Sequence, residues 1–189
     1  MSNLDQHINA IVPFSKEELA IIRQAFSEAS LAKGKFFSKQ KRVCQKLAFV
    51  QTGYLRVYLE TGDQEVTQWI TSPGYFITDL SSFVFGVEGR WNIQALTDCT
   101  LLEISKSAHD ELCQRLPAWK DLYNFFIVKC FTLLEDRIFN HLHMSTDERF
   151  KHLMETQPEL FNVVPLQYLA SMLGMTPETL SRLRKKLDK

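Results

Sequence analysis

LQYLASMLGMTPETLSRLRKKL, residues 166–187, is the stretch that decides the organisation of this 189-residue chain. Its apolar residues recur three or four positions apart on both sides of Gly174, which predicts two short helices joined by a turn. Gly174 tolerates a left-handed backbone, and Thr176 and Pro177 suit an N-cap and a first helical residue. The apolar faces hold Leu166, Leu169, Ala170 and Leu173 in the first helix, and Leu180, Leu183 and Leu187 in the second. The stretch predicts a helix-turn-helix.

The outward side of the second helix carries residue types that contact base edges or phosphates. They are Glu178, Thr179, Ser181, Arg182 and Lys185. Residues 177–189 hold five basic and two acidic residues, which gives +3, whereas the whole chain is neutral. This local positive charge suits a phosphate backbone and predicts a DNA-binding protein. The alternative is a helical hairpin that only covers a core.

The composition describes a chain with a substantial core. Hydrophobic residues make up 45 % of it, and its length suits one large or two small domains. No run of about 18 apolar residues occurs, so no membrane span is expected. The first residues, MSNLDQH, lack the basic and apolar regions of a secretory signal, and we therefore expect a cytoplasmic protein.

The sequence contains no local motif for catalysis or metal binding. The four cysteines, Cys44, Cys99, Cys113 and Cys130, form no C-x-x-C pair, and we expect reduced, mostly buried thiols. Gly-rich phosphate loops, a nucleophile elbow and H-E-x-x-H are all missing from the sequence. We therefore expect no metal site and no enzymatic activity.

The middle of the chain is typical of an antiparallel β domain. Residues 14–29 have a helical apolar stripe and a capping box formed by Ser15 and Glu18. Short β-like runs separated by turn residues follow, at 47–50, 54–59, 65–70, 91–96 and 100–104. This pattern predicts an α+β protein whose β domain, with its flanking helices, is a jelly roll over residues 1–117.

A long helix is predicted over residues 118–142, which contain neither glycine nor proline. It is apolar over more than one narrow stripe, so one side packs on the sheet while another is free to face a second copy. The predicted dimer residues are Leu122, Phe126, Ile127, Phe131, Leu134 and Ile138. The alternative is a helix buried within the monomer. A second capping box at Ser145 and Glu148 places a hinge near 143–146, between a dimerisation helix (118–143) and a helix-turn-helix domain (144–189).

The whole chain resembles the Crp/Fnr superfamily of bacterial transcription regulators. The resemblance is carried by FVQTGYLRVY (49–58), SPGYFI (72–77) and above all ELFNVVPLQYLASMLGMTPETLSR (159–182). It implies a cyclic-nucleotide-binding jelly roll, a dimerisation helix and a winged helix-turn-helix. The partners it implies are double-stranded DNA, a second copy of the chain and RNA polymerase.

The effector pocket departs from the family pattern. Cyclic-AMP-responsive members hold the ribose with a Gly-Glu pair and the cyclic phosphate with the Arg of an Arg-Ser pair. Thr78 and Asp79 stand at the first pair, and Gly89 and Arg90 at the second, so Arg90 would reach a phosphate only if its loop shifted by one residue. The resemblance places the pocket at Tyr75, Thr78, Asp79, Arg90 and Trp91.

A buried phosphodiester without a cationic partner is costly, so we expect no cyclic nucleotide and no other cofactor. Two alternatives stay open: an unidentified small effector in the same cavity, or a cavity that holds no ligand. The cluster cysteines of Fnr-type members are also missing, so iron–sulfur oxygen sensing is not expected.

The chain also ends seven residues after Arg182, which leaves no room for the wing of the family. We therefore expect the recognition helix and its basic tail to carry more of the DNA affinity. Arg182 is the expected guanine reader and Glu178 the acceptor from a cytosine amino group. Base-edge or phosphate contacts are expected from Thr176, Thr179 and Ser181, and salt-dependent attraction from Arg184, Lys185, Lys186 and Lys189.

A rival interpretation comes from another class of protein. The absence of a wing and of net charge also fits a ligand-sensing or interaction module that has lost specific DNA binding. Salt-sensitive binding to random duplex DNA distinguishes the two interpretations.

Overall fold

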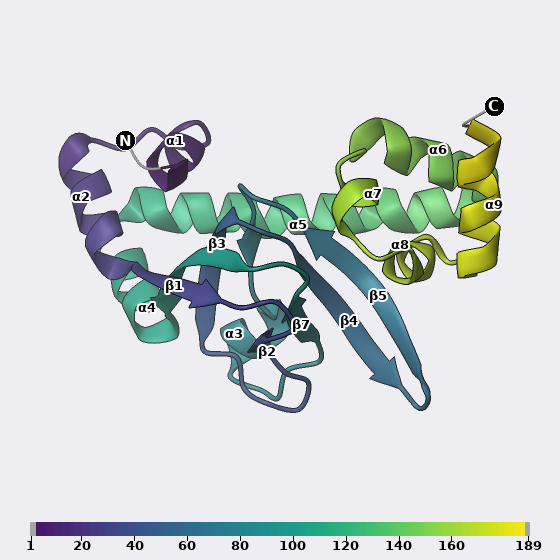
Figure 1. Cartoon of the computed structure of the whole chain (residues 1–189). Helices are drawn as coiled ribbons and strands as arrows, with labels where there is room; N and C mark the ends of the chain where they lie inside the picture. The colour runs from purple at the N-terminus through teal and green to yellow at the C-terminus, as the bar shows by residue number, and fades with distance from the viewer. Residues whose placement is uncertain (1–2, 188–189) are drawn as a thin grey trace. The chain divides into compact units, whose positions relative to one another are not determined.

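The computed structural model describes residues 3–187 and divides into two compact units (Figure 1). The first unit comprises Met1–Val57 and Ile70–Lys129, and the second comprises Tyr58–Trp69 and Cys130–Lys189. Among the described residues, each helix is either too short or insufficiently apolar to cross a membrane.

The N-terminal part contains two helices, α1 (Asn3–Asn9) and α2 (Lys16–Ala25). The predicted capping box starts α2: the Ser15 hydroxyl accepts from the Glu18 N–H, and the Glu18 carboxylate accepts from the Ser15 N–H at 2.8 Å. The predicted helix over 14–29 is wrong at its end, because Ser27–Leu31 forms strand β1 and pairs with β8 (Cys99–Ser105). This pairing joins residues 68 to 76 positions apart and overrides the local helical pattern.

The predicted antiparallel β domain is confirmed. All five strands expected from the sequence are present, as β3 (Lys46–Thr52), β4 (Leu55–Thr61), β5 (Gln64–Thr71), β7 (Asn92–Ala95) and β8. Two short strands, β2 (Phe36–Ser38) and β6 (Phe76–Ile77), complete the set. One sheet has the order β1-β8-β3-β6 and the other β2-β7-β4-β5.

The main core lies in the first unit, where apolar side chains of the strands meet those of the helices. Leu47, Phe49 and Ile104 supply its strand side. Its helical side comes from α1, α2, α3 (Leu80–Phe85), α4 (Lys106–Arg115) and the first turns of α5 (Pro117–His143). The predicted long helix over 118–142 is confirmed, and Trp119 and Leu122 anchor its beginning at 1 % and 3 % exposure.

The second unit contains the outer part of the β4–β5 hairpin, the C-terminal half of α5 and four shorter helices. These are α6 (Thr146–Thr156), α7 (Leu160–Val163), α8 (Leu166–Leu173) and α9 (Pro177–Leu187). The second predicted capping box, Ser145 with Glu148, begins α6. The division between the units lies inside α5, after Lys129, whereas the sequence placed the C-terminal domain from residue 144. Within the second unit, the Arg137 side chain of α5 donates a hydrogen bond to the Met172 carbonyl of α8.

Candidate nucleic-acid interface

Helices α8 and α9 are the two short helices joined by a turn that residues 166–187 predict (Figure 1). Gly174 ends α8 in the left-handed region, at φ +67°, as its position requires. The Met175 N–H donates to the Ala170 carbonyl at 3.0 Å, which closes the end of the helix. The turn is therefore a glycine-dependent helix end followed directly by a new helix start.

The start of α9 has the expected cap. The Thr176 hydroxyl oxygen accepts from the Thr179 N–H at 3.3 Å, and Pro177 is the first helical residue. The Thr176 hydroxyl also donates to the Thr179 hydroxyl oxygen at 3.2 Å. Both threonine hydroxyls thus have hydrogen-bond partners within the cap, which leaves the rest of the outer face to the longer side chains.

The two helices cross through small and aliphatic side chains. Leu169 and Ala170 of α8 and Leu180 of α9 are all 0 % exposed, and Leu173 and Leu183 are also buried. Leu166 is only half-buried and lines a surface groove instead. The predicted packing role of Leu187 falls on a side chain outside those the structure describes, and Lys189 lies outside the described residues.

An open groove runs along the outer face of α9. It is lined by Leu166, Pro177, Glu178, Ser181, Arg182, Lys185 and Lys186. The structure thus brings together five of the predicted contact residues, because positions 178, 181, 182 and 185 share one helix face. Arg184 is exposed but lies outside this groove, and Thr176 and Thr179 serve the cap.

The electrostatics of this face favour an anionic partner. Helix α9 has four basic residues and one acidic residue, which gives +3 in a neutral chain. The acidic residue, Glu178, sits in the first turn, where hydrogen bonds from its own backbone N–H and from Thr176 lower the pKa of its carboxyl. Glu178 therefore stays an acceptor at neutral pH, beside the cationic side chains of the same groove.

Helix α8 is also anchored within its unit to the β4–β5 hairpin. The Ser171 hydroxyl oxygen accepts from the Thr67 N–H at 2.9 Å, and the hydroxyl donates to the Glu65 carbonyl at 3.2 Å. One side chain of α8 thus takes the place of a strand neighbour along β5. This contact was not expected from the sequence, because no local pattern links residues about 105 positions apart.

The residues predicted for the effector pocket lie in the first unit, around α3. Asp79 is 1 % exposed and caps α3, accepting from the Ser82 N–H at 3.3 Å and the Ser81 hydroxyl at 3.1 Å. Its second carboxylate oxygen accepts from the backbone N–H groups of Arg90 and Trp91 at 2.7 and 3.0 Å. The Arg90 and Trp91 N–H groups of this loop therefore already donate to a carboxylate within the protein.

The other predicted pocket residues do not converge on a common point. The Thr78 hydroxyl donates to the Lys46 carbonyl at 2.9 Å, and the Arg90 guanidinium lies over the Trp91 ring at 5.1 Å. Tyr75 is 37 % exposed, with the Lys129 ammonium over its ring. A Cβ at Gly89 would come within 2.8 Å of the Arg42 carbonyl oxygen, so the position expected for a phosphate-binding arginine has no room for a side chain.

The predicted dimer face of α5 needs one correction. Leu122 is 3 % exposed and belongs to the core of the first unit, so it is not available to a second chain. Phe126 is partly buried against the same core, and Ile127 is half-buried. Phe131 and Ile138 are each 60 % exposed and Leu134 is 40 % exposed, which leaves them free for contact.

Further exposed apolar residues on this helix were not among the predicted dimer residues. They are Phe125, Val128, Phe139 and Leu142, at 47 %, 62 %, 61 % and 80 % exposure. The apolar character was visible in the sequence, but a helix that is apolar on several sides does not reveal which side the monomer covers.

Comparisons with known proteins agree with this architecture. Residues 28–116 match the family model described as the cyclic nucleotide-binding domain. The fold is that of FixK2 from Bradyrhizobium japonicum (TM-score 0.74, 19 % identity, covering 86 % of this chain and 84 % of that one). It is also that of the c-di-GMP-responsive regulator CLP from Xanthomonas campestris (0.71, 18 %, 92 % of each chain).

A third solved structure is a putative Crp/Fnr-family transcriptional regulator from Eubacterium rectale. Its TM-score is 0.72 at 15 % identity, and the match covers 93 % of this chain and 84 % of that one. No curated protein sequence matches the chain. These likenesses span both units.

Proposed function

We propose that the protein is a DNA-binding transcription regulator, because residues 28–116 match the cyclic nucleotide-binding domain and the fold is that of FixK2 and CLP. It acts as a homodimer whose two α9 helices enter successive major grooves about 34 Å apart. Its site is then a pseudo-palindrome, and RNA polymerase is the machinery that it regulates. The cytoplasm is the compartment where such a protein meets its DNA.

The observation that carries the proposal is the exposed groove along α9. Arg182 lies in its middle and is proposed to donate two hydrogen bonds to a guanine. Glu178, one helical turn earlier, is proposed to accept from a cytosine amino group. Lys185 and Lys186 follow toward the end of the helix, where they attract phosphates and give binding its salt dependence.

The dimer contact is proposed for the exposed apolar side chains of α5. Phe131, Ile138 and Leu142 are all at least 60 % exposed, although they are large and apolar. Together with Leu134, which is 40 % exposed, they recur at three- or four-residue spacing, which is typical of a helix that pairs with another helix. A second copy of α5 would cover them and relate two α9 helices by a two-fold axis.

A cyclic nucleotide does not fit the residues of the β domain. Its phosphate would have to displace the Asp79 carboxylate from the Arg90 and Trp91 N–H groups, or lie beside that charge. No side chain at Gly89 is available to neutralise it. We propose that this domain takes no cyclic phosphate and that any effector is of another chemical class.

Arg182→Ala tests the recognition role directly. We expect the variant to lose on the order of 1–3 kcal/mol of discrimination at one base pair of the site, while it stays folded. Lys185→Ala should instead weaken binding to all duplexes alike and reduce the salt slope by about one phosphate contact. Binding isotherms on matched and mismatched duplexes at several salt concentrations measure both effects. Wild-type affinity and sequence preference in Arg182→Ala would refute the assignment.

A further inference from the structure

The end of helix α8 directs two carbonyl groups toward neighbouring helices. The backbone closes this end through the Gly174 and Met175 N–H groups, which donate to Ser171 and Ala170. The carbonyls of Met172 and Leu173 accept from arginine side chains instead. These two carbonyls immediately precede the turn, so whatever holds them also fixes where α9 begins.

Arg137 of α5 holds the first of these carbonyls. Its guanidinium is partly buried, and Nη2 donates to the Met172 carbonyl oxygen at 2.5 Å. Burial lowers the pKa of Arg137 to about 10, so the group is still charged at neutral pH. A buried cation at the carboxyl end of a helix is stabilised by the helix dipole and by the hydrogen bond that it donates.

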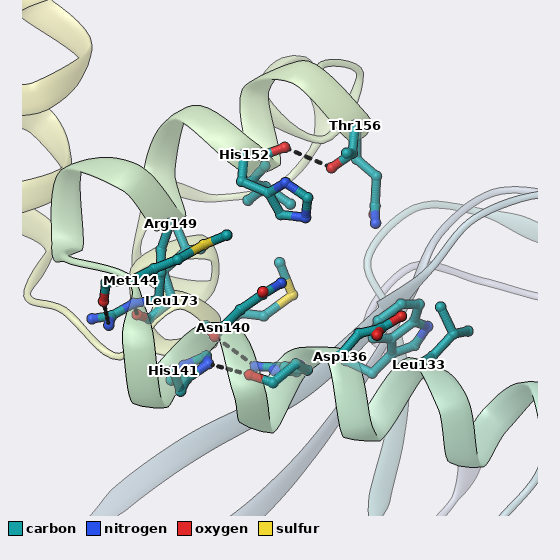
Figure 2. A pocket seen from close by; sticks show the side chains of 14 residues that line it. Leu133, Asp136, Asn140, His141, Met144, Arg149, His152, Thr156 and Leu173 are labelled. Atoms are coloured by element: carbon teal, nitrogen blue, oxygen red, sulfur yellow. Dashed lines mark hydrogen bonds between the residues drawn. The ribbon is translucent and has the colours of Figure 1, made fainter.

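Arg149 of α6 holds the second carbonyl. Its Nε donates to the Leu173 carbonyl oxygen at 3.0 Å, and its Nη1 donates to the Met144 carbonyl oxygen at 2.9 Å. Met144 belongs to the short connection between α5 and α6. One guanidinium therefore joins this connection to the end of α8, as Figure 2 shows for the labelled Arg149, Met144 and Leu173.

His141 of α5 fills the space beside the turn. Its Nδ1 lies 3.0 Å from the Arg137 carbonyl oxygen, and a Cβ on Gly174 would lie 3.4 Å from its Nε2. The imidazole therefore packs against the turn, while its Nδ1 contacts the backbone of its own helix, α5. Arg137, Arg149 and His141, which we call the clasp, all lie in the second unit, and all contact residues 172–174.

We propose that Arg137 and Arg149 are positioning residues for DNA recognition, which tie the turn between α8 and α9 to α5 and α6. The position of α5, the proposed dimer helix, then sets the orientation in which α9 enters the major groove of DNA. The inference rests on the proposed function. It adds that the affinity depends on two arginines whose hydrogen bonds are made to protein carbonyls rather than to phosphates.

The test is DNA affinity as a function of salt for Arg137→Met and Arg149→Met, each compared with the wild type. Methionine keeps an apolar stem but removes every donor. Loss of one charge-assisted hydrogen bond should weaken binding on the order of tenfold at each salt concentration. The salt slope should stay that of the wild type, because no phosphate contact is lost. Arg115→Met is the matched control, since Arg115 lies on α4 and pairs with Glu111 on the surface.

Arg137→Lys provides a rescue, because lysine keeps the positive charge and an ammonium group that can donate to the Met172 carbonyl. It should recover part of the affinity lost in Arg137→Met. All variants are assayed well below their unfolding temperatures. A role limited to stability would lower the melting temperature but leave the affinity of the folded protein unchanged. That result, or a salt slope reduced by about one in either methionine variant, would refute the proposed positioning role of the two arginines.

Hydrogen exchange separates this proposal from the proposed function. In Arg137→Met and Arg149→Met, the amides of residues 174–180 should exchange faster than in the wild type, with or without DNA. If the wild type fails to bind DNA, the proposed function fails, but the exchange data still test the clasp. Unchanged exchange in both variants would refute it.

Discussion

The Asp79 carboxylate accepts four hydrogen bonds in the described structure: three from backbone N–H groups and one from the Ser81 hydroxyl. A single buried side chain thereby caps α3 and fixes the loop that precedes β7. The resemblance to the Crp/Fnr superfamily led us to expect a ribose-binding acid at this position, but the acceptor capacity of Asp79 is used within the protein. The residue type alone does not distinguish a ligand-binding acid from a structural one.

Asp79→Ala should be strongly destabilising. The substitution leaves the N–H groups of Ser82, Arg90 and Trp91 without their acceptor, and each unsatisfied buried donor costs about 1–3 kcal/mol. We expect a loss of about 3 kcal/mol in the free energy of unfolding, measured by urea denaturation. Glu88→Ala, at an exposed position of the same loop, is the control and should change stability little. Equal stabilities of the two variants would contradict this account of Asp79.

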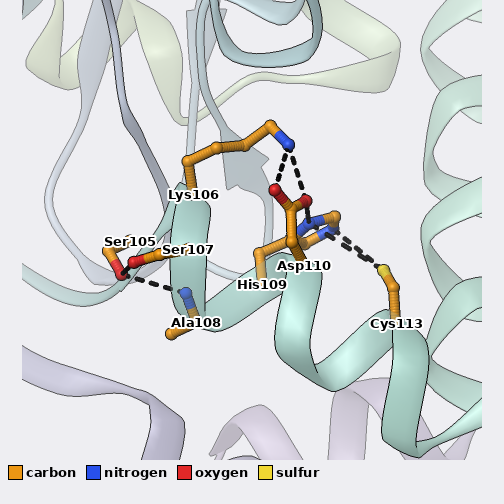
Figure 3. A network of polar contacts seen from close by, with 7 residues as sticks. All are labelled: Ser105, Lys106, Ser107, Ala108, His109, Asp110 and Cys113. Carbon is orange, nitrogen blue, oxygen red and sulfur yellow. Dashed lines mark hydrogen bonds and ion pairs between the residues drawn. The ribbon is translucent and has the colours of Figure 1, made fainter.

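The surroundings of His109 change the pKa of its imidazole. It is 4 % exposed and packs against Phe83 and Tyr123, with ring centroids 5.2 and 4.4 Å away. Figure 3 shows it between Asp110 and Cys113 on α4, with Asp110 Oδ1 3.3 Å from its Nδ1. Burial lowers the pKa of His109, and the contact with Asp110 opposes this only in part.

Stability should therefore fall as the pH drops from 7 to 5. Because burial lowers the pKa of His109 in the folded state, the unfolded chain, with an imidazole pKa of about 6.5, binds a proton more readily, so acid favours unfolding. In His109→Leu the difference between the free energies of unfolding at pH 7 and pH 5 should shrink. His7 and His141, whose pKa values are also lowered by burial, account for a remainder. His152→Gln, at an exposed position, is the control. If His109→Leu kept the pH dependence of the wild type, the contribution assigned to His109 would be wrong.

At the scale of elements, α5 divides its apolar side chains between two tasks. Its beginning supplies Trp119 and Leu122 to the core, and its later turns expose Phe131, Ile138 and Leu142. The dimer proposal therefore concerns the later turns.

Ile138→Asp should prevent dimerisation without unfolding the monomer. An exposed isoleucine contributes little to the core of one chain, but a carboxylate at the centre of an apolar contact is costly. Sedimentation velocity should report a monomer for this variant and a dimer for the wild type. Ser107→Asp, an exposed site on α4, is a control for the added charge. A wild-type monomer at micromolar concentration would contradict the proposed contact.

Elements with local determinants could be predicted from the sequence. The Gly174 turn, the Thr176 cap and both capping boxes follow from residues three or four positions apart, and the structure has all of them. The end of α2 could not be predicted, because β1 forms through pairing with distant β8. The clasp was missed for the same reason, since Arg137 contacts a residue 35 positions away.

At the scale of the whole molecule, residues 28–116 match the cyclic nucleotide-binding domain, and α8 is followed after a turn by α9 with its basic face. The long helix α5 contributes residues to both units. Under the proposed function, dimerisation and DNA recognition both depend on this helix. The interior contacts of Asp79 are the ground on which we propose that the β domain takes no cyclic phosphate.

We propose that a dimer of this chain recognises a symmetric DNA site without an effector. Selection from a random duplex library with purified, ligand-free protein tests it most directly, with sequencing of the retained duplexes and Arg182→Ala in parallel. We predict enrichment of two inverted half-sites centred about one helical turn apart, with the preference at one position lost in the variant. Retention that is sensitive to salt but enriches no symmetric sequence would contradict the claim.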